Sequence, residues 1–224
     1  MTGLEELIYS KFIFFFMPRK RCERVFHQLD EIPMNDRYKQ SKVLKIKKNP
    51  KEITYDSPYE KEIIEDLDGC SFVKKIKTQS LVISFQSKSS HKVRKYYPDL
   101  QVLLVDGRMV LIEVKPFKEM VNKHNLLKHE ALKKYCKKNR YGYAILDYDY
   151  YSFEDLKKEK VSIFIQNKFI KFVKRKREVT FDECDSFKKE NNITDYQICY
   201  IIWKNRNKCL KYQQHKIMYD KYTE

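Results

Sequence analysis

The sequence predicts an α/β fold in which a mixed β-sheet is flanked by helices. Three observations support this: a capped amphipathic helix, a strand hairpin around an Asp-Gly turn, and a second helix that leads into a buried strand. The 224 residues suffice for one large domain, or for a medium domain with a small partner. We expect a basic N-terminal arm at residues 1–50, the α/β core at 51–156 and a small C-terminal domain at 157–224.

The N-terminal arm is weakly patterned, with one short helix expected at Glu23–Leu29. Its apolar run, Phe12–Met17, is too short to span a bilayer and lacks the cleavage pattern of a signal peptide. We interpret the run as a segment that docks on the core or covers it. The alternative, that the run is a translated artefact upstream of a true start at Met17, stays open.

The first core helix is expected to begin at Pro58. Ser57 can cap it, Pro58 fits its first turn, and apolar residues recur at positions 59, 63, 64 and 67. Gly69 is expected to end the helix. The pattern Ser57-x-x-Glu60 also has the form of a capping box, in which Glu60 would bond the first amide groups of its own helix.

The strands of the core follow this helix. Two are predicted at Phe72–Ile76 and Ser80–Phe85, and a hairpin is indicated by Asp106–Arg108 between two apolar alternating runs. A helix over Asn122–Lys138 and a buried strand at Tyr141–Tyr148 complete the core. The resulting order is helix, three strands, helix, strand.

The register of the hairpin decides which side chains share a face. A two-residue turn would place Asp99 opposite Val114, whereas the three-residue turn Asp106–Arg108 places it opposite Lys115 and on the face of Glu113. We favour the three-residue turn because both strands then bury the same apolar side. That side consists of Leu100, Val102, Leu104, Val110, Ile112 and Val114.

Asp99, Glu113 and Lys115 would then converge at one end of the opposite face. Two neighbouring carboxylates repel each other unless a cation lies between them, and oxygen ligands of this kind suit Mg²⁺ or Mn²⁺. Such an ion could generate hydroxide for attack on a phosphodiester, and Lys115 could stabilise the developing charge. The alternative interpretation is a surface hairpin with an Asp–Lys ion pair and an incidental Glu.

The C-terminal region has a different pattern. We expect an extended pair at Val161–Val173, helices at Thr180–Glu190 and Thr194–Lys204, and a hairpin formed by Lys208–Tyr212 and Lys216–Tyr219. Helix, turn, helix and hairpin is the order of a winged helix. Many small α+β domains share this order.

The charge balance favours a polyanionic partner. The chain has 47 Lys and Arg against 31 Asp and Glu, a net charge of +16, and release of counterions from nucleic-acid phosphates would favour binding. A Lys-rich composition also arises from an AT-biased genome, so charge alone does not decide the partner. The run Lys171–Arg177 is a candidate for contact with a phosphate backbone.

Two further residue classes bear on location and on the site. The six cysteines form no CxxC pair, which predicts reduced thiols and a cytoplasmic protein, and no stretch is long enough to cross a membrane. Asp147 and Asp149 lie in the Tyr-rich stretch 141–151 and could be extra metal ligands. We favour a solubilising role for them at the edge of the sheet.

Several motifs occur in a characteristic order between Tyr55 and Leu156. They are Ser57-x-x-Glu60, the strand Thr78–Ile83 with its Gln79, Tyr97-Pro98-Asp99, Ile112-Glu113-Val114-Lys115-Pro116, and Leu126-x-Lys128-x-Glu130-Ala131 leading to Tyr135-Cys136. In this order they resemble the TnsA-type transposon endonucleases of the PD-(D/E)xK nuclease superfamily. Two positions depart from the family pattern: Glu113 stands where the best-known member has glutamine, and Ser80 stands where a proline is usual.

This resemblance implies a restriction-endonuclease-like core in which Glu60, Asp99 and Glu113 hold Mg²⁺, with Mn²⁺ able to substitute, and Lys115 is the catalytic lysine. It implies a DNA endonuclease that cuts one strand at transposon ends, beside a TnsB-like transposase subunit and a TnsC-like AAA+ regulator. It also implies a winged-helix-like domain for partner contacts after residue 156. The alternatives are a stand-alone restriction or repair nuclease, and a catalytically inactive DNA-binding scaffold.

Overall fold

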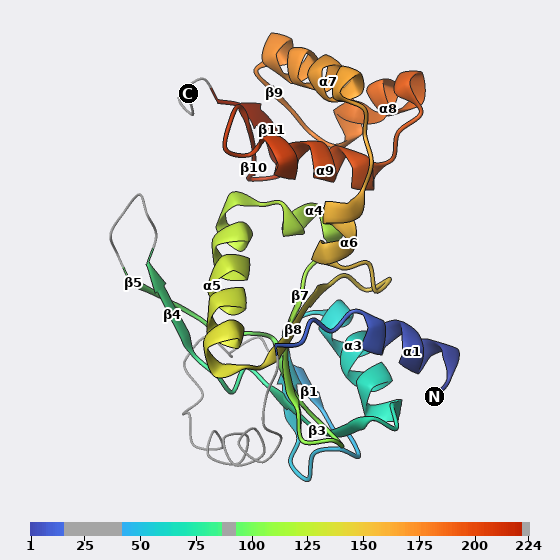
Figure 1. Ribbon diagram of the computed structural model, residues 1–224, viewed down its shortest axis with the longest axis vertical. Coiled ribbons are helices and arrows are strands. Elements are labelled where there is room, and N and C mark those ends of the chain that lie inside the picture. The colour runs from blue at the N-terminus through green and yellow to red at the C-terminus, as the bar shows by residue number, and fades with distance from the viewer. Residues whose placement is uncertain (16–41, 87–92, 221–224) are drawn as a thin grey trace. The chain divides into compact units, whose positions relative to one another are not determined.

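The structure is a computed structural model that describes residues 1–15, 42–86 and 93–220 (Figure 1). The chain forms two compact units. The N-terminal unit comprises Met1–Lys115 and Lys128–Ser152, and the C-terminal unit comprises Pro116–Leu127 and Phe153–Glu224. The helix expected at Glu23–Leu29 lies outside the described residues.

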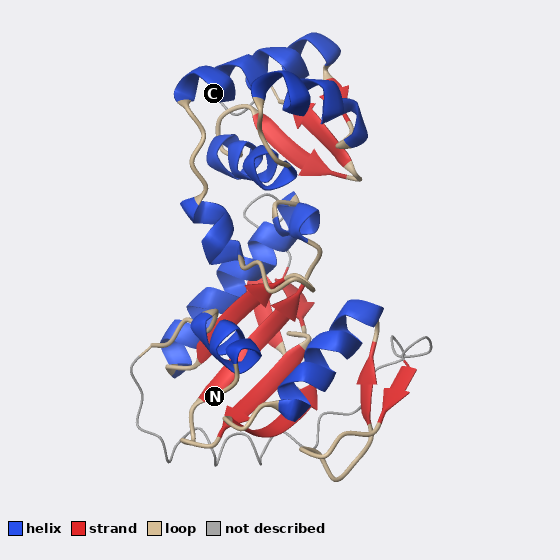
Figure 2. Cartoon of the chain, turned by 90° about the vertical axis from the view of Figure 1, so that its right-hand side faces the viewer, coloured by secondary structure: helices blue, strands red, loops and turns tan. Residues whose placement is uncertain are grey.

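A four-stranded mixed sheet forms the centre of the N-terminal unit (Figure 2). Its strands are, in spatial order, β3 (Val73–Thr78), β6 (Leu100–Leu104), β7 (Met109–Val114) and β8 (Gly142–Leu146). Strand β6 pairs antiparallel with both β3 and β7, and β8 runs parallel to β7 after the connection through α5 (Lys123–Asn139). Counted over this sheet, the order α3, three strands, α5 and one strand agrees with the prediction, but the strand predicted at Ser80–Phe85 is not part of the sheet.

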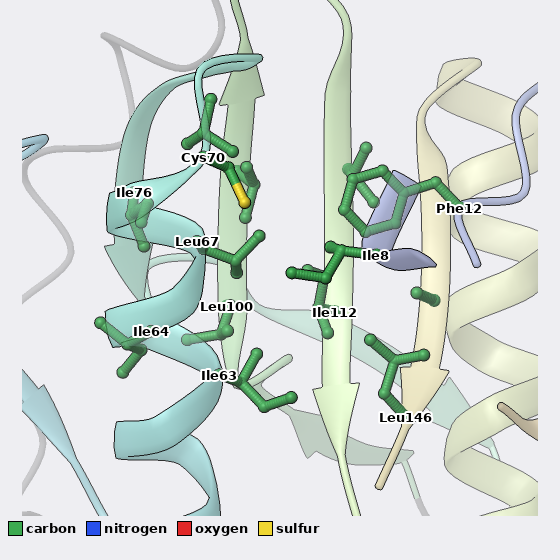
Figure 3. Close-up of a cluster of buried hydrophobic side chains, with 14 of the residues drawn as sticks. Ile8, Phe12, Ile63, Ile64, Leu67, Cys70, Ile76, Leu100, Ile112 and Leu146 are labelled. Atoms are coloured by element: carbon green, nitrogen blue, oxygen red, sulfur yellow. The ribbon is translucent and has the colours of Figure 1, made fainter. Parts of the chain in front are cut away.

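Helix α3 (Pro58–Gly69) covers one face of this sheet and begins and ends where the sequence predicts. The Ser57 hydroxyl accepts a hydrogen bond of 3.2 Å from the Glu60 N–H, and Pro58 occupies the first turn. Its buried face packs against Leu100, Val102, Val110 and Ile112 of the sheet (Figure 3). The buried side chains of α3 are Glu60, Ile63, Ile64 and Leu67.

The N-terminal segment contributes to the same core. Helix α1 (Gly3–Ser10) places Ile8 in the cluster of buried side chains, and Phe12 joins it (Figure 3). Ile13 then forms an isolated antiparallel bridge with Tyr143 of β8. The prediction that the apolar run covers the core is therefore confirmed for its described residues, 12–15.

The hairpin of β6 and β7 has the predicted faces but a shifted turn. Its three turn residues are Val105, Asp106 and Gly107, because the Leu104 N–H donates to the Arg108 carbonyl, and Gly107 takes up the positive φ of 83°. The expected turn at residues 106–108 and the pairing of Asp99 with Lys115 are therefore wrong. The ladder begins at the pair Leu100–Ile112, but both registers leave the same side chains on each face.

The strand predicted at Ser80–Phe85 is confirmed only for Ile83–Phe85. Gln79 has a φ of 45°, and its N–H donates to the Asp99 carbonyl, so β3 ends at Thr78 and the chain leaves the central sheet. Only β4 (Ile83–Gln86) is regular, and it pairs with β5 (Val93–Tyr96) in a separate two-stranded sheet. A further short pair is formed by β1 (Lys42–Leu44) and β2 (Ile53–Tyr55).

The C-terminal unit contains the predicted winged-helix order with an additional leading helix and strand (Figure 1). Strands β10 and β11 form the expected hairpin, and β9 pairs with β11. Two short helices from earlier parts of the chain, α4 (Phe117–Met120) and α6 (Phe153–Lys158), belong to the same unit. The remaining elements are α7 (Ile163–Lys176), β9 (Glu178–Val179), η3 (Asp182–Cys184), α8 (Asp185–Asn191), α9 (Asp195–Asn205), β10 (Leu210–Gln213) and β11 (Lys216–Tyr219).

The extended pair expected at Val161–Val173 is wrong, because this segment is the helix α7. The β-branched and aromatic residues at its start, Ile163-Phe164-Ile165, are typical of a strand, but Ser162 caps a helix by accepting from the Ile165 N–H at 3.3 Å. Phe169 and Val173, four residues apart, are then buried on one face.

Two chain-wide properties complete the fold. No helix within the described residues is both long and apolar enough to cross a membrane. No disulfide joins the five cysteines in these residues, and all except Cys209 are buried.

Candidate active site

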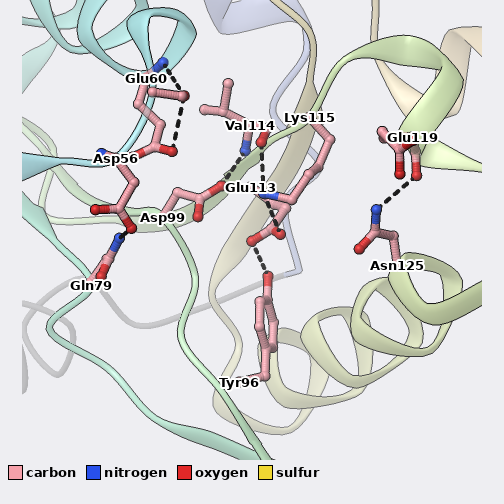
Figure 4. Close-up of polar contacts among 11 residues, drawn as sticks. Asp56, Glu60, Gln79, Tyr96, Asp99, Glu113, Val114, Lys115, Glu119 and Asn125 are labelled. Carbon is pink, nitrogen blue, oxygen red and sulfur yellow. Dashed lines mark hydrogen bonds and ion pairs between the residues drawn. The ribbon is translucent and has the colours of Figure 1, made fainter. Parts of the chain in front are cut away.

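Three of the predicted site residues meet where β7 ends. Glu113 and Lys115 lie on the same face because they are two residues apart, and Asp99 directly precedes β6 beside them (Figure 4). The Lys115 Nζ lies 3.1 Å from the Asp99 Oδ2 and 3.0 Å from the Glu113 Oε1. The convergence predicted for Asp99, Glu113 and Lys115 is present in the structure.

The Asp99 carboxylate is held in a buried environment that opposes its charge. Burial and the neighbouring Glu113 raise its pKa to about 7, although Lys115 and a hydrogen bond from the Val114 N–H act in the opposite direction. That hydrogen bond is 2.7 Å long and fixes Oδ2. Asp99 is therefore a carboxyl group whose ionisation depends on a nearby positive charge.

Lys115 supplies that charge in the structure. Burial would lower the pKa of its ammonium group, but the Asp99 and Glu113 carboxylates outweigh this effect and raise it. Nζ also donates to the Val114 carbonyl at 2.8 Å. Lys115 is thus a fixed, protonated group directed at both carboxylates.

Glu60 lies at the start of α3 and faces the same site. Its carboxylate accepts from the Asp56 N–H at 3.0 Å and from the Ser57 hydroxyl at 3.1 Å, so it helps to organise the start of the helix. Burial raises the pKa of Glu60, whereas these bonds and the charge of Lys115 lower it. The Glu60 charge in turn raises the pKa of Asp99. The predicted capping box is therefore not closed, because Glu60 accepts from the Asp56 N–H and not from the Ser57 N–H, but Glu60 still bonds the start of its helix while it faces the site.

Two residues that were not predicted as site residues, Tyr96 and Gln79, support the site. The buried Tyr96 hydroxyl donates to the Glu113 Oε2 at 2.6 Å, and the Gln79 amide donates to the Asp56 Oδ2 at 2.8 Å (Figure 4). Tyr96 stands three residues before Asp99, and a buried tyrosine hydroxyl needs a polar partner. This need could have marked Tyr96 in the sequence as a residue with a polar contact. Which group Tyr96 contacts, however, depends on where β5 lies.

Comparison with known proteins gives one family match. Residues 70–147 match the family described as TnsA-like endonuclease N terminal. This segment is a TnsA-type nuclease domain. The matched range contains Asp99, Glu113 and Lys115, whereas Glu60 lies before it. No curated protein matches the chain.

The donor set of the TnsA-type domain suits a hard divalent ion. Asp99 and Glu113 offer buried carboxylate oxygens, and Asp99 resists ionisation without a counter-charge. Within residues 1–15, 42–86 and 93–220, no three His, Cys, Asp or Glu side chains are arranged as a metal-binding group, and Lys115 provides the counter-charge. The assignment of Glu60, Asp99 and Glu113 as metal ligands stays a prediction.

Asp147 in the TnsA-type domain is not a solubilising edge residue. Its side chain is buried, and its Oδ1 accepts hydrogen bonds from the Asp149 N–H at 3.0 Å and from the Tyr151 N–H at 2.8 Å. Asp149 is exposed, as expected. Asp147 therefore shapes the turn after β8.

Proposed function

We propose that this chain is a Mg²⁺-dependent DNA endonuclease that cuts one strand at transposon ends, as the TnsA-like subunit of a heteromeric transposase. The observation that carries the proposal is the arrangement of Lys115 against Asp99 and Glu113 within a TnsA-type domain. A protonated lysine beside two buried carboxylates suits hydrolysis of a phosphodiester, in which negative charge develops near a cation.

Each site residue has a distinct proposed role. Asp99 and Glu113, with Glu60, would hold Mg²⁺ or in its place Mn²⁺, which would polarise a phosphoryl oxygen and lower the pKa of a bound water. The Lys115 ammonium would orient the attacking water or stabilise charge on the phosphoryl oxygens. Tyr96 would keep Glu113 in position through its hydroxyl.

The proposed partners follow from the same family match. Double-stranded DNA would be the substrate, and a TnsB-like transposase subunit and a TnsC-like AAA+ regulator would assemble with the chain. The net charge of +16 supports a polyanionic substrate.

One observation favours a second candidate, a catalytically inactive DNA-binding scaffold. Lys115 already balances Asp99 and Glu113, so these three side chains also form a self-sufficient structural ion-pair cluster. In this candidate the hairpin stabilises the fold and the chain contributes only DNA binding.

Strand cleavage by matched variants tests the proposal. Asp99→Asn preserves side-chain shape and Lys115→Ala removes the ammonium, and each should lower Mg²⁺-dependent nicking of a transposon-end duplex by at least about 10²-fold. Lys133→Ala, which changes an exposed residue of α5, is the control and should nick normally. Circular dichroism and DNA binding without metal should be unchanged in Asp99→Asn.

The outcomes separate the candidates. Wild-type protein that never cleaves DNA with any divalent ion or with the transposase partners would support the scaffold. Cleavage of unrelated duplex without partners would instead indicate a stand-alone restriction or repair nuclease. Normal nicking by Asp99→Asn would contradict the assigned site.

A further inference from the structure

The last helix of the winged-helix order, α9, is covered within its own unit. Of its eleven residues, only Lys204 is exposed. Helices α4 and α6 contact α9, with the Phe117 ring 4.6 Å from that of Tyr196 between ring centroids. The N-terminal end of α9 is closed by Asp195, whose carboxylate pairs with Lys188 at 2.6 Å and with Lys118 at 3.5 Å.

This covering excludes the usual mode of DNA reading. In a helix-turn-helix, the second helix enters the major groove and its N-terminal residues contact base edges. Helix α9 occupies that place after α8, but α4 and α6 pack against it, and the side chain at its start, Asp195, is already bonded to Lys188 and Lys118. Any nucleic-acid contact of the C-terminal unit therefore has to use another element.

Helix α7 offers such an element, on the side of the unit away from α4 and α6 (Figure 1). Four cations recur on one exposed face at spacings of three and four residues, which places them in a row along the helix. They are Lys168, Lys171, Lys174 and Arg175. The row spans about 10 Å, and a DNA strand carries one charge every ~3.4 Å along its axis.

The charge of this row is available to a ligand. Helix α7 contains no acidic residue, and among the described residues neither Lys171 nor Arg175 has an ion-pair partner. Lys168 bonds only a neutral group, the Asn191 amide oxygen, at 2.9 Å. Lys174 lies over the Tyr219 ring, 5.3 Å from its centroid, and stays exposed.

We infer that the exposed basic face of α7 binds the phosphate backbone of duplex DNA, in place of base reading by α9. The inference rests on the proposed function only in the choice of DNA as the polyanion. The row contains lysines and one arginine without groups aimed at base edges, so it would position the duplex without reading its sequence. Binding should therefore be equally strong on unrelated sequences.

Salt-dependent binding of the full chain tests this inference. A short fluorescent duplex is titrated in EDTA, so that binding is measured without cleavage, from about 50 to about 200 mM salt. The expected affinity is at least about tenfold weaker in the triple variant Lys171→Gln/Lys174→Gln/Arg175→Gln. The slope of log affinity against log salt should also be less steep by about two to three. A shuffled duplex should show the same loss.

The control removes the same number of charges from another exposed helix surface, as Lys133→Gln/Lys134→Gln/Lys137→Gln on α5. In this control variant, the slope of log affinity against log salt should stay closer to that of wild type. Equal affinity and slope in the α7 variant and the control would overturn the inference, as expected if an acidic protein occupies this face. Because the measurement needs no cleavage, a chain that never cuts DNA but loses affinity in the α7 variant would leave the inference standing and the nuclease proposal refuted.

Discussion

Lys115 and Tyr96 act on the same carboxylate from two directions. Lys115 approaches the Oε1 of Glu113, and the Tyr96 hydroxyl donates to its Oε2, so both oxygens of Glu113 are fixed. Burial and the neighbouring Glu113 raise the pKa of the Tyr96 hydroxyl well above its usual value, so the hydroxyl stays a donor. Tyr96 is thus a positioning residue for a proposed ligand.

Tyr96→Phe should weaken Mg²⁺ binding without unfolding the chain. Loss of a partner that orients a metal ligand costs about 10- to 100-fold in metal affinity or activity. The Mg²⁺ concentration needed for half-maximal nicking should therefore rise, and excess Mg²⁺ should restore part of the rate.

Tyr212→Phe is the matched control, because the buried Tyr212 hydroxyl also donates to a carboxylate, that of Glu119, in the C-terminal unit. It should leave the Mg²⁺ dependence of nicking unchanged. An unchanged Mg²⁺ midpoint in Tyr96→Phe would show that its hydroxyl is only a satisfied core group.

The sequence predicted the meeting of Asp99, Glu113 and Lys115 because strand alternation alone decides which side chains share a face. The contacts of Tyr96 and Gln79 could not be predicted in this way. They depend on where the chain passes after it leaves the central sheet at Gln79, and that path is set by tertiary packing.

At the scale of elements, the turn after β8 is organised around one buried acid. Burial raises the pKa of Asp147 to about 6, against the effect of its two backbone hydrogen bonds. An aspartate in the unfolded chain titrates near 3.9. Between these values the folded state holds more protons than the unfolded state, so the free energy of unfolding falls as the pH rises.

Asp147→Asn should remove this pH dependence while keeping the turn, because an amide oxygen can accept the same two backbone bonds. In wild type, protonated Asp147 adds about 1–2 kcal/mol to the free energy of unfolding. This contribution is complete below about pH 4 and is lost above about pH 6. Urea unfolding at several pH values measures the difference. Asp149→Asn, in the same turn, is the control; parallel pH profiles of Asp147→Asn and wild type would refute the role of Asp147.

Sequence patterns identified most elements correctly where a cap or a turn residue marked their ends. Ser57, Gly69 and Thr194 mark helix ends that the structure has within a residue. Helix α7 was misassigned because it begins with a β-branched and aromatic run, Ile163–Ile165, and the burial of Phe169 and Val173 on one face reveals its helical period.

At the scale of the whole molecule, the N-terminal segment is part of the core of the N-terminal unit. Ile8 is fully buried, and Phe12 lies in the same cluster. The sequence indicated a covering role for the apolar run, but the helix before it lacks a long apolar period. Helix α1 belongs to the core because its Ile8 packs in the same cluster as the side chains of α3 and the central sheet.

Ile8→Ala should therefore destabilise the unit by about 2–5 kcal/mol, through lost burial and the cavity left behind. Leu7→Ala, which truncates a neighbouring side chain that is 41% exposed, is the matched control and should cost much less. Denaturant unfolding compares the two. Equal stability of both variants would mean that α1 is not part of the core.

The three-residue turn of the β6–β7 hairpin has one further consequence. Because side chains alternate along a strand, adding one residue to this turn would send Asp99 to the face opposite Glu113, whereas adding two would return it. Val105 in this turn is 60% exposed, and such a surface loop ordinarily tolerates changes in length. Here the proposed chemistry at the far end of the hairpin would permit only changes by even numbers of residues.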